Sequence, residues 1–399
     1  MELLAPAGGW EQLRAALHFG ADAVYLGGAR FGLRVRADNF GGGDLGKAVD
    51  LVHSYGKKAY VTANALVHPG ELPALKEHLH AIADSGADAA LISDLGALAL
   101  ARREVPQLPL HISTQASVTN AEAARVYADL GATRIVLARE LSLEEIAAIR
   151  RDLDPHIQLE VFVHGSMCIA YSGRCLISNY LADRDANRGN CSQPCRWSYA
   201  LEEEQRPGEY LPLEEVHGRS FVLSSADLMM LDHLDDLKAA GADSLKIEGR
   251  VKSAYYTATV VNAYRQVLDG RPAAEMLPEL DAVSHRPYHT GFFYGAPRQA
   301  PHGKEYSQTC DFIGIVDACT KNADGTYRIR TMLRNRFAAG EALEALAPGK
   351  PIRSFAAANI EDEDGWPVAE AVKTAHAYTV DAPFPLNPQD ILRKRRSQR

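Results

Sequence analysis

Short apolar runs alternate with stretches of helical periodicity along the first 270 residues of the chain. The apolar runs have the length of buried strands and are bounded by polar residues or glycine. Eight strands are predicted: Leu3–Ala5, Ala23–Gly27, Lys58–Ala63, Ala89–Ser93, Leu110–Thr114, Arg134–Ala138, Gln158–Val163 and Ser244–Glu248. Between them, apolar residues recur at helical spacing, as at Leu72, Leu75, Leu79 and Ile82. The pattern therefore predicts strands and helices in regular alternation.

Four junctions between a helical stretch and the next strand are built alike. Gly20, Gly86, Gly131 and Gly241 each end a helix and are followed by alanine and a strand. Glycine suits this place because a helix often ends in a left-handed residue. One repeated unit and eight strands predict the α/β class and a TIM-like (β/α)8 barrel. An open doubly wound sheet is the alternative, although no G-x-G-x-x-G follows the first strand.

Changes in the predicted elements and in the composition along the chain predict its domains. A barrel over residues 1–270 includes a cysteine-rich insertion at 165–223, which follows the seventh strand and therefore lies over the C-terminal face. A connecting segment is expected at 271–307, a small all-β, barrel-like domain at 308–390 and a basic tail at 391–399. The strands predicted for the all-β domain are Phe312–Val316, Tyr327–Met332, Glu341–Leu346, Val368–Val372 and Tyr378–Val380.

Composition limits where the protein works and what it binds. The net charge of −8 argues against nucleic-acid binding over the whole surface, but it leaves a local basic patch possible. The chain has neither an apolar run long enough to cross a membrane nor the basic and apolar start of a signal peptide. A cytoplasmic location is expected, where six cysteines are not read as three disulfides.

Four of the six cysteines lie close together in the insertion. Cys168, Cys175, Cys191 and Cys195 are separated by six, fifteen and three residues. Four thiolates can surround one metal centre, either a structural zinc ion or a [4Fe-4S] cluster. The spacing favours iron–sulfur, because only the last pair matches the short pairs of zinc sites. The other two cysteines, Cys310 and Cys319, are expected to be ordinary buried thiols.

Polar residues collect at the ends of the predicted strands, where barrel enzymes carry their chemistry. The candidate catalytic residues are His164, Glu248 and Arg250. The candidate substrate-binding residues are Asn64, Asp94, Gln115, Arg139, Arg174 and Lys252. The cations among them suit an anionic small molecule or an RNA phosphate. Structural alternatives are a helix cap for Asp94, a hydrogen-bonded structural role for His164, and an ion pair between Glu248 and Arg250.

Several motifs resemble those of a known family. They are Glu160-x-Phe162-x-x-Gly165-Ser166-Met167-Cys168-x₄-Gly173-x-Cys175-x-x-Ser178, Leu4–Gly8, Asp183–Gly189, Lys246–Tyr256, Ser284–Tyr288 and Arg334–Phe337. Together they are similar to the collagenase-like peptidase family of unknown mechanism, over essentially the whole chain. Within it, the branch most alike converts uridine at the wobble position (34) of tRNA to 5-hydroxyuridine, without molecular oxygen and in dependence on prephenate.

This resemblance implies a [4Fe-4S] cluster, tRNA as substrate and prephenate as a co-substrate whose two carboxylates fit the cationic strand ends. Some relatives have a cysteine in the stretch that matches Asp227–Met230, where this chain has methionines. A cluster held only by protein must therefore use the four cysteines of the insertion. The rival functions are hydroxylation of ribosomal RNA or of a ubiquinone precursor, collagen-degrading peptidase activity, and non-catalytic RNA binding. Against the peptidase, the chain has no H-E-x-x-H motif and no recognisable Ser–His–Asp arrangement.

Overall fold

The computed structural model describes residues 1–35, 37–41, 43–197, 201–202, 210–211, 225–295 and 306–396. Contacts divide the chain into two units, each of which is built from several segments. The first unit contains Met1–Leu13, Ala21–Lys252 and His285–Tyr306. The second unit contains Arg14–Gly20, Ser253–Ser284 and Ser307–Arg399. None of the described helices is long and apolar enough to span a membrane.

The first unit is a closed parallel barrel. Its strands are β1 (Glu2–Pro6), β2 (Ala23–Gly27), β3 (Lys58–Ala63), β4 (Ala89–Ile92), β5 (Leu110–Ile112), β6 (Ala132–Val136), β7 (Gln158–Ser166) and β11 (Ser244–Ile247). Each strand pairs with the next, and β11 closes the ring by pairing in parallel with both β7 and β1. All eight predicted strands are present. The barrel is confirmed, and the closure excludes an open doubly wound sheet.

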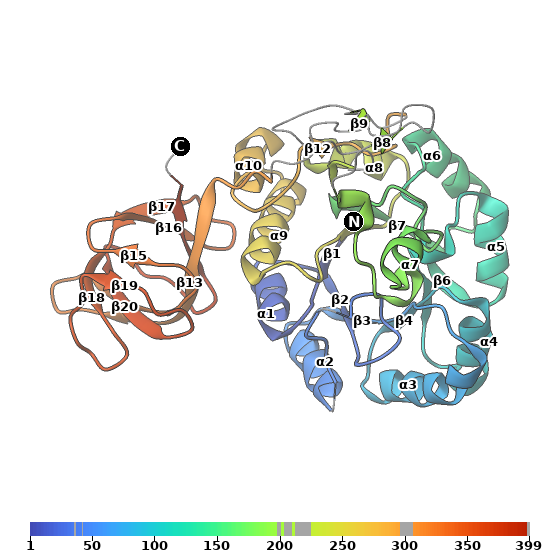
Figure 1. The fold of residues 1–399 in the computed structure, drawn as a ribbon, viewed down its shortest axis with the longest axis horizontal. Coiled ribbons are helices and arrows are strands. Elements are labelled where there is room, and N and C mark those ends of the chain that lie inside the picture. The colour runs from blue at the N-terminus through green and yellow to red at the C-terminus, as the bar shows by residue number, and fades with distance from the viewer. Residues whose placement is uncertain are drawn as a thin grey trace. The chain divides into compact units, whose positions relative to one another are not determined.

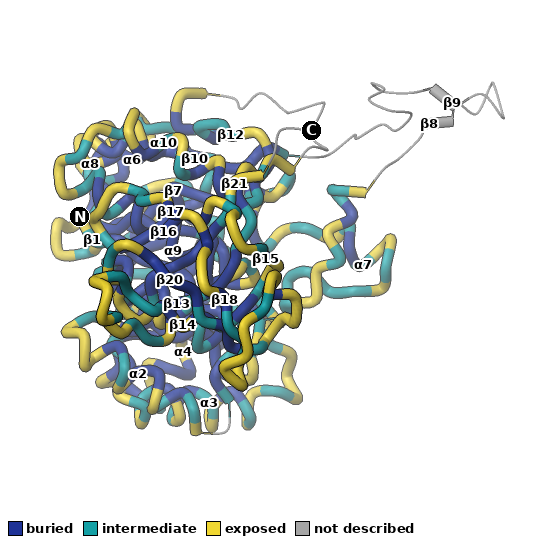
Figure 2. The backbone as a smooth tube through the Cα atoms, turned by 90° about the vertical axis from the view of Figure 1, so that its left-hand side faces the viewer, coloured by how far each residue is buried: buried dark blue, intermediate teal, exposed yellow. Residues whose placement is uncertain are grey.

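Helices follow the strands along the chain. They are α1 (Trp10–His18), α2 (Asp44–Ser54), α3 (Leu72–Asp84), α4 (Leu95–Glu104), α5 (Ala121–Asp129), α6 (Leu143–Asp152) and α8 (Leu234–Ala239). Figure 1 shows α2 to α6 as a ring outside the strands, and in Figure 2 the exposed residues gather on helices and loops. The four predicted glycine junctions have φ between +76° and +99°, the left-handed region that glycine reaches most easily.

A charged layer fills the N-terminal half of the barrel interior. Arg134 is 2 % exposed and donates to Glu2 (Nη1 to Oε1, 2.6 Å) and to Glu160 (Nη1 to Oε2, 2.9 Å). Lys246 Nζ donates to the other oxygen of Glu160 at 2.6 Å. Each buried charge thus has an opposite partner, which offsets the cost of removing it from water. The layer closes the interior below the C-terminal ends of the strands.

Strand β7 runs past the predicted end at Val163 and carries an extra antiparallel strand. There β10 (Asp227–Met229) pairs with β7, and β12 (Tyr288–His289) pairs with β10. The sequence does not show this extension because His-Gly-Ser follows the apolar run. The predicted connection at 271–307 contains β12 and the helix α10 (Ala273–Leu280). The insertion carries α7 (Ile177–Ala182), and much of it beyond residue 197 lies outside the described residues.

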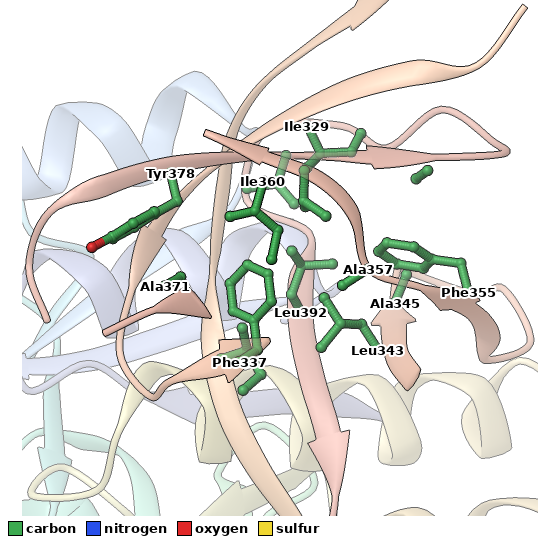
Figure 3. Close-up of a cluster of buried hydrophobic side chains, with 14 of the residues drawn as sticks. Ile329, Phe337, Leu343, Ala345, Phe355, Ala357, Ile360, Ala371, Tyr378 and Leu392 are labelled. Atoms are coloured by element: carbon green, nitrogen blue, oxygen red, sulfur yellow. The ribbon is translucent and has the colours of Figure 1, made fainter. Parts of the chain in front are cut away.

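The second unit contains α9 (Ala254–Leu268), α10 and an antiparallel sheet. The sheet has the order β17 (Arg353–Ala356), β16 (Ala342–Leu346), β21 (Ile391–Arg395), β13 (Cys310–Lys321), β14 (Tyr327–Leu333), β20 (Ala377–Ala382) and β18 (Ala358–Glu361). Two short strands, β15 (Phe337–Ala338) and β19 (Glu370–Ala371), pair beside it. Buried side chains including Ile329, Phe337, Leu343, Ile360 and Leu392 converge between the strands (Figure 3). The predicted all-β domain is confirmed.

The predicted basic tail is wrong for residues 391–395. They form β21, which lies between β16 and β13 in the sheet. Arg393 is fully buried because its guanidinium donates to Glu344 (Nε to Oε2, 2.8 Å) and to Glu279 (Nη1 to Oε2, 2.6 Å). These charged residues suggested a solvated tail, but they form a strand whose basic side chains bond to acidic residues far away in the sequence. Residues 397–399 of the predicted tail lie outside the described residues.

Candidate functional site

A cavity opens at the C-terminal ends of the barrel strands. It encloses about 530 Å³, counting the part that is open to solvent. Its walls are formed by Tyr25, Leu33, Arg34, Thr62, Asn64, Leu91, Ser113, Thr114, Gln115, Arg139, Phe162, Lys246, Glu248 and Arg250. Four of these side chains are cationic and one is a carboxylate, so the lining favours an anionic ligand. We call this space the barrel-mouth cavity.

Glu248 follows β11 and is held as an anion. Its carboxylate accepts from Arg34 (Nε at 3.1 Å and Nη2 at 2.7 Å) and from the Tyr25 hydroxyl at 3.0 Å. Burial alone would raise the pKa of Glu248, but the charge and hydrogen bonds of Arg34 bring that pKa down to about 2. Glu248 therefore carries no proton near neutral pH. It orients Arg34 at the wall of the cavity.

Arg250 is a buried cation whose hydrogen bonds go to neutral groups. It is 3 % exposed, and its Nη1 donates to Thr62 Oγ1 at 2.9 Å while Nη2 donates to Asn39 Oδ1. Among the described residues, its Nε has no hydrogen-bond partner. Burial is the main reason why the pKa of Arg250 falls to about 10, and the charge of Arg34 adds to it. The guanidinium of Arg250 therefore bonds to Thr62 and Asn39 and not to Glu248, so the structural alternative of an ion pair between Glu248 and Arg250 is not supported.

The predicted substrate-binding residues divide into two groups. Asn64, Gln115 and Arg139 line the barrel-mouth cavity. Asn64 Nδ2 donates to Ser113 Oγ at 3.0 Å. Arg139 Nη1 donates to the Ser166 carbonyl at 3.0 Å, and its guanidinium carbon lies 5.3 Å from the centre of the Phe162 ring.

Three predicted residues are absent from the described lining of this cavity. Asp94 caps α4, because its Oδ1 accepts from the backbone N–H of Ala97 at 2.9 Å, as the structural alternative holds. Arg174 is exposed. Lys252 lies 5.8 Å from the Tyr306 ring centre, and its pKa is lowered by burial and by the like charges of Arg196 and Arg286.

His164 belongs to a buried cluster beside the barrel mouth. Its ring centre lies 5.4 Å from that of Tyr288, which in turn stacks on His285 at 4.0 Å. Asp227 holds Arg286 through two bonds to its Oδ1 (Nε at 3.1 Å and Nη2 at 2.6 Å). These residues come from β7, β10 and the segment around β12, which the extra antiparallel strand brings together. His164 does not line the described walls of the cavity, although it was predicted as a catalytic residue.

The burial of His164 predicts a dependence of stability on pH. Burial is the main reason why its pKa falls from 6.5 to about 3, while Asp227 opposes the shift. Between these values the unfolded chain binds a proton that the folded chain does not, so stability falls as the pH drops from 6.5 toward 3. Between pH 7 and 5 the loss through this residue is about 2 kcal/mol.

His164→Asn should remove that part of the pH dependence. Urea unfolding of the wild type and of the variant at both pH values measures the difference. An identical pH dependence in the two proteins would contradict the assignment.

The four cysteines of the insertion lie near one another beside the cavity. Burial raises the pKa of Cys195, the charge of Arg196 opposes this shift, and the charges of Cys168, Cys191 and Cys175 raise the pKa further, so the four thiols interact electrostatically. The charge of Glu248 is the main reason why the pKa of the cavity residue Arg34 is raised, and the charge of Cys168 adds to it. Within the described part of the chain, however, no three Cys, His, Asp or Glu side chains are arranged to hold a metal ion. Four thiols are the donor set that a thiolate-bound cluster requires.

Some functional residues were missed by sequence reasoning. Arg34, Tyr25 and Thr62 form the direct environment of Glu248 and Arg250. Thr62 could have been found from the period of two in β3, which points alternate side chains into the barrel. Arg34 lies in the long loop after β2 and carries no local signal of its role.

The fold and the site define a class of protein: a TIM barrel with a cationic cavity at its C-terminal face and a cysteine-rich insertion beside it. Residues 8–302 match the model of Peptidase family U32, and residues 308–393 match that of the Peptidase family U32 C-terminal domain. The chain belongs to peptidase family U32. This membership confirms the family predicted from the motifs.

Relatives in this family carry names that refer to RNA. The chain is 38% identical over 375 residues to tRNA hydroxylation protein P1 of Bacillus subtilis (strain 168), covering 91% of this chain and 87% of the relative. It is 34% identical over 439 residues to tRNA hydroxylation protein P of Escherichia coli (strain K12), covering 98% of this chain and 94% of the relative. It is 41% identical over 269 residues to the 23S rRNA 5-hydroxycytidine C2501 synthase of the same organism, covering 67% of this chain and 39% of the relative.

Proposed function

We propose that this protein is an RNA-modifying enzyme that hydroxylates tRNA, converting the wobble uridine (position 34) to 5-hydroxyuridine without molecular oxygen. The observation that carries the proposal is the cationic cavity at the C-terminal face of the barrel, where enzymes of this fold bind their substrates. The names of the relatives that cover almost the whole chain support tRNA as the substrate. The relative that acts on ribosomal RNA matches a smaller part of both chains.

The proposed co-substrate is prephenate, a dianion. Of the four cationic side chains that line the cavity, Lys246 is paired with Glu160 and Arg34 with Glu248. The charges of Arg139 and Arg250 are left to attract two carboxylates. Arg250 favours such a ligand, because its buried Nε has no hydrogen-bond partner among the described residues. Arg34 is already oriented by Glu248, and Arg139 by a backbone carbonyl. Each guanidinium is thus held in place before a ligand arrives, which reduces the entropy lost on binding.

The proposed cofactor is a [4Fe-4S] cluster held by Cys168, Cys175, Cys191 and Cys195. Four thiolates are the usual ligands of such a cluster, and it supplies one-electron transfer when bound. Ser172 lies between Cys168 and Cys175 in the sequence, and its Oγ accepts from Nη2 of the cavity residue Arg139 at 2.8 Å, which supports a position beside the barrel-mouth cavity. In this scheme the chain binds the anionic co-substrate and orients it, and Glu248 stays ionised throughout because of its depressed pKa.

Deleting the gene tests the substrate. Nucleoside mass spectrometry of total tRNA should show that 5-hydroxyuridine and its derivatives at position 34 disappear while other modified nucleosides keep their levels. An oxygen-dependent enzyme with the same product would mask the loss, so the deletion strain is grown with and without oxygen. Unchanged levels of the modified nucleosides at position 34 under both conditions would contradict tRNA as the substrate.

Ribosomal RNA is the second candidate substrate, because one relative is named for it. The same strain supplies the test. Loss of a hydroxylated nucleoside from ribosomal RNA, with tRNA unchanged, would move the proposed activity to that substrate.

A further inference from the structure

A second cavity lies beside the barrel-mouth cavity in the first unit. It encloses about 670 Å³, counting the part that is open to solvent. Its walls come from the loop after β2, from the segment that follows β3, and from Arg188 of the cysteine-rich insertion. We call it the rim cavity.

The insertion closes one side of the rim cavity through specific contacts. Arg188 Nη2 donates to Glu71 Oε1 at 2.6 Å, and the N–H of Leu66 donates to the Asn187 carbonyl at 3.3 Å. A methyl group on Gly189 would lie 2.8 Å from the Gly32 carbonyl oxygen, so the two backbones are in close contact. The insertion therefore contributes one wall of the rim cavity.

The lining of the rim cavity combines two arginines with apolar groups and with one carboxylate, that of Glu71. Arg30 is exposed, and its guanidinium carbon lies 5.3 Å from the Phe31 ring centre. In the described part of the chain no carboxylate pairs with it. Arg188 uses one of its five N–H donors on Glu71, which leaves others available to a ligand. Leu66 is 43 % exposed and adds apolar surface.

Backbone strain marks the same loop. Phe31 has a φ of +60°, which is costly for a bulky side chain and is found preferentially at functional sites, and Asn39 has a φ of +53°, which asparagine adopts more easily. An arginine pair with an exposed aromatic or apolar surface is the combination that binds single-stranded nucleotides.

Two residues connect the rim cavity to the barrel-mouth cavity. Asn39 lines the rim cavity, and its Oδ1 accepts from Arg250, which lines the other. A methyl group on Gly32 would lie 3.2 Å from Thr62 Oγ1, which also lines the barrel-mouth cavity. The two cavities therefore share a wall, which Asn39 and Gly32 form on one side and Arg250 and Thr62 on the other.

We propose that the rim cavity binds the nucleotide that adjoins the modified one, with its phosphate against Arg30 and Arg188 and its base against Phe31 and Leu66. This inference rests on the proposed function, because it requires a single-stranded RNA that enters the barrel mouth. It assigns the RNA backbone to a site that is separate from the one for the small anion. It also gives the insertion a second task, since Arg188 comes from it.

The test measures RNA binding by the loaded protein, using a fluorescently labelled, unmodified tRNA transcript as the probe. Arg30→Gln should raise the Kd on the order of tenfold, because a charge-assisted contact to phosphate is lost. The matched control is Arg151→Gln, an exposed arginine in the last turn of α6. It removes the same charge and should change the Kd by less than about twofold, as expected for weak long-range electrostatics. Both variants should keep the iron content and melting temperature of the wild type.

A synthetic anticodon stem–loop with a neutral methylphosphonate beside the target uridine locates the contact. If Arg30 binds that phosphate, the neutral linkage should weaken binding to the wild type but not to Arg30→Gln, so the two changes are not additive. A Kd for Arg30→Gln equal to that of Arg151→Gln, with tRNA still bound by the wild type, overturns this inference alone. Failure of the wild type to bind any tRNA overturns the proposed function as well.

Discussion

Replacing Arg250 by methionine should abolish RNA hydroxylation without lowering the melting temperature. The guanidinium is buried, and its hydrogen bonds go to two neutral side chains rather than to a carboxylate. A buried cation of this kind costs stability, so an apolar side chain of similar length should keep the melting temperature or raise it. Losing its contacts to a bound carboxylate should lower kcat/KM by about a hundredfold or more.

The lysine variant separates ligand binding from a structural role. An ammonium cannot make the paired contacts of a guanidinium, so Arg250→Lys should also lose most of the activity. Thermal unfolding, iron content and tRNA modification are measured on both variants. If Arg250 only braced the strand end, Arg250→Met would lower the melting temperature together with the activity, and lysine would restore both.

Removing Cys191 should remove the cluster and with it the activity. The wild type, purified without oxygen, should be brown and contain about four irons per chain. Cys191→Ala should lose nearly all of that iron and hydroxylate no RNA. The side chain is exposed, so the substitution leaves the hydrophobic core intact and the loss should not come from unfolding.

Cys319→Ala is the matched control, since this thiol lies in β13 of the second unit. It should keep both the iron and the activity. Stoichiometric zinc in a colourless wild-type protein, or unchanged iron in Cys191→Ala, would contradict the proposed cofactor.

Local patterns in the sequence determined the barrel and its order. Apolar runs mark each parallel strand because such strands are buried on both faces, and the junction glycines mark where helices end. Motifs within a few residues, such as the cap at Asp94, could also be anticipated. The cysteine spacing likewise identified the insertion as a possible cluster site. These features depend on neighbours along the chain, so they can be read without a fold.

Only the tertiary structure decided which polar groups meet. Glu248 pairs with Arg34, which is 214 residues away, rather than with the nearby Arg250. The charged residues near the C-terminus form strand β21, because Glu344 and Glu279 compensate the charge of the buried Arg393. The rim cavity likewise forms from two loops and an insertion that are distant in sequence. In each case the partner of a charge is chosen by barrel closure and sheet pairing, and no local periodicity encodes that choice.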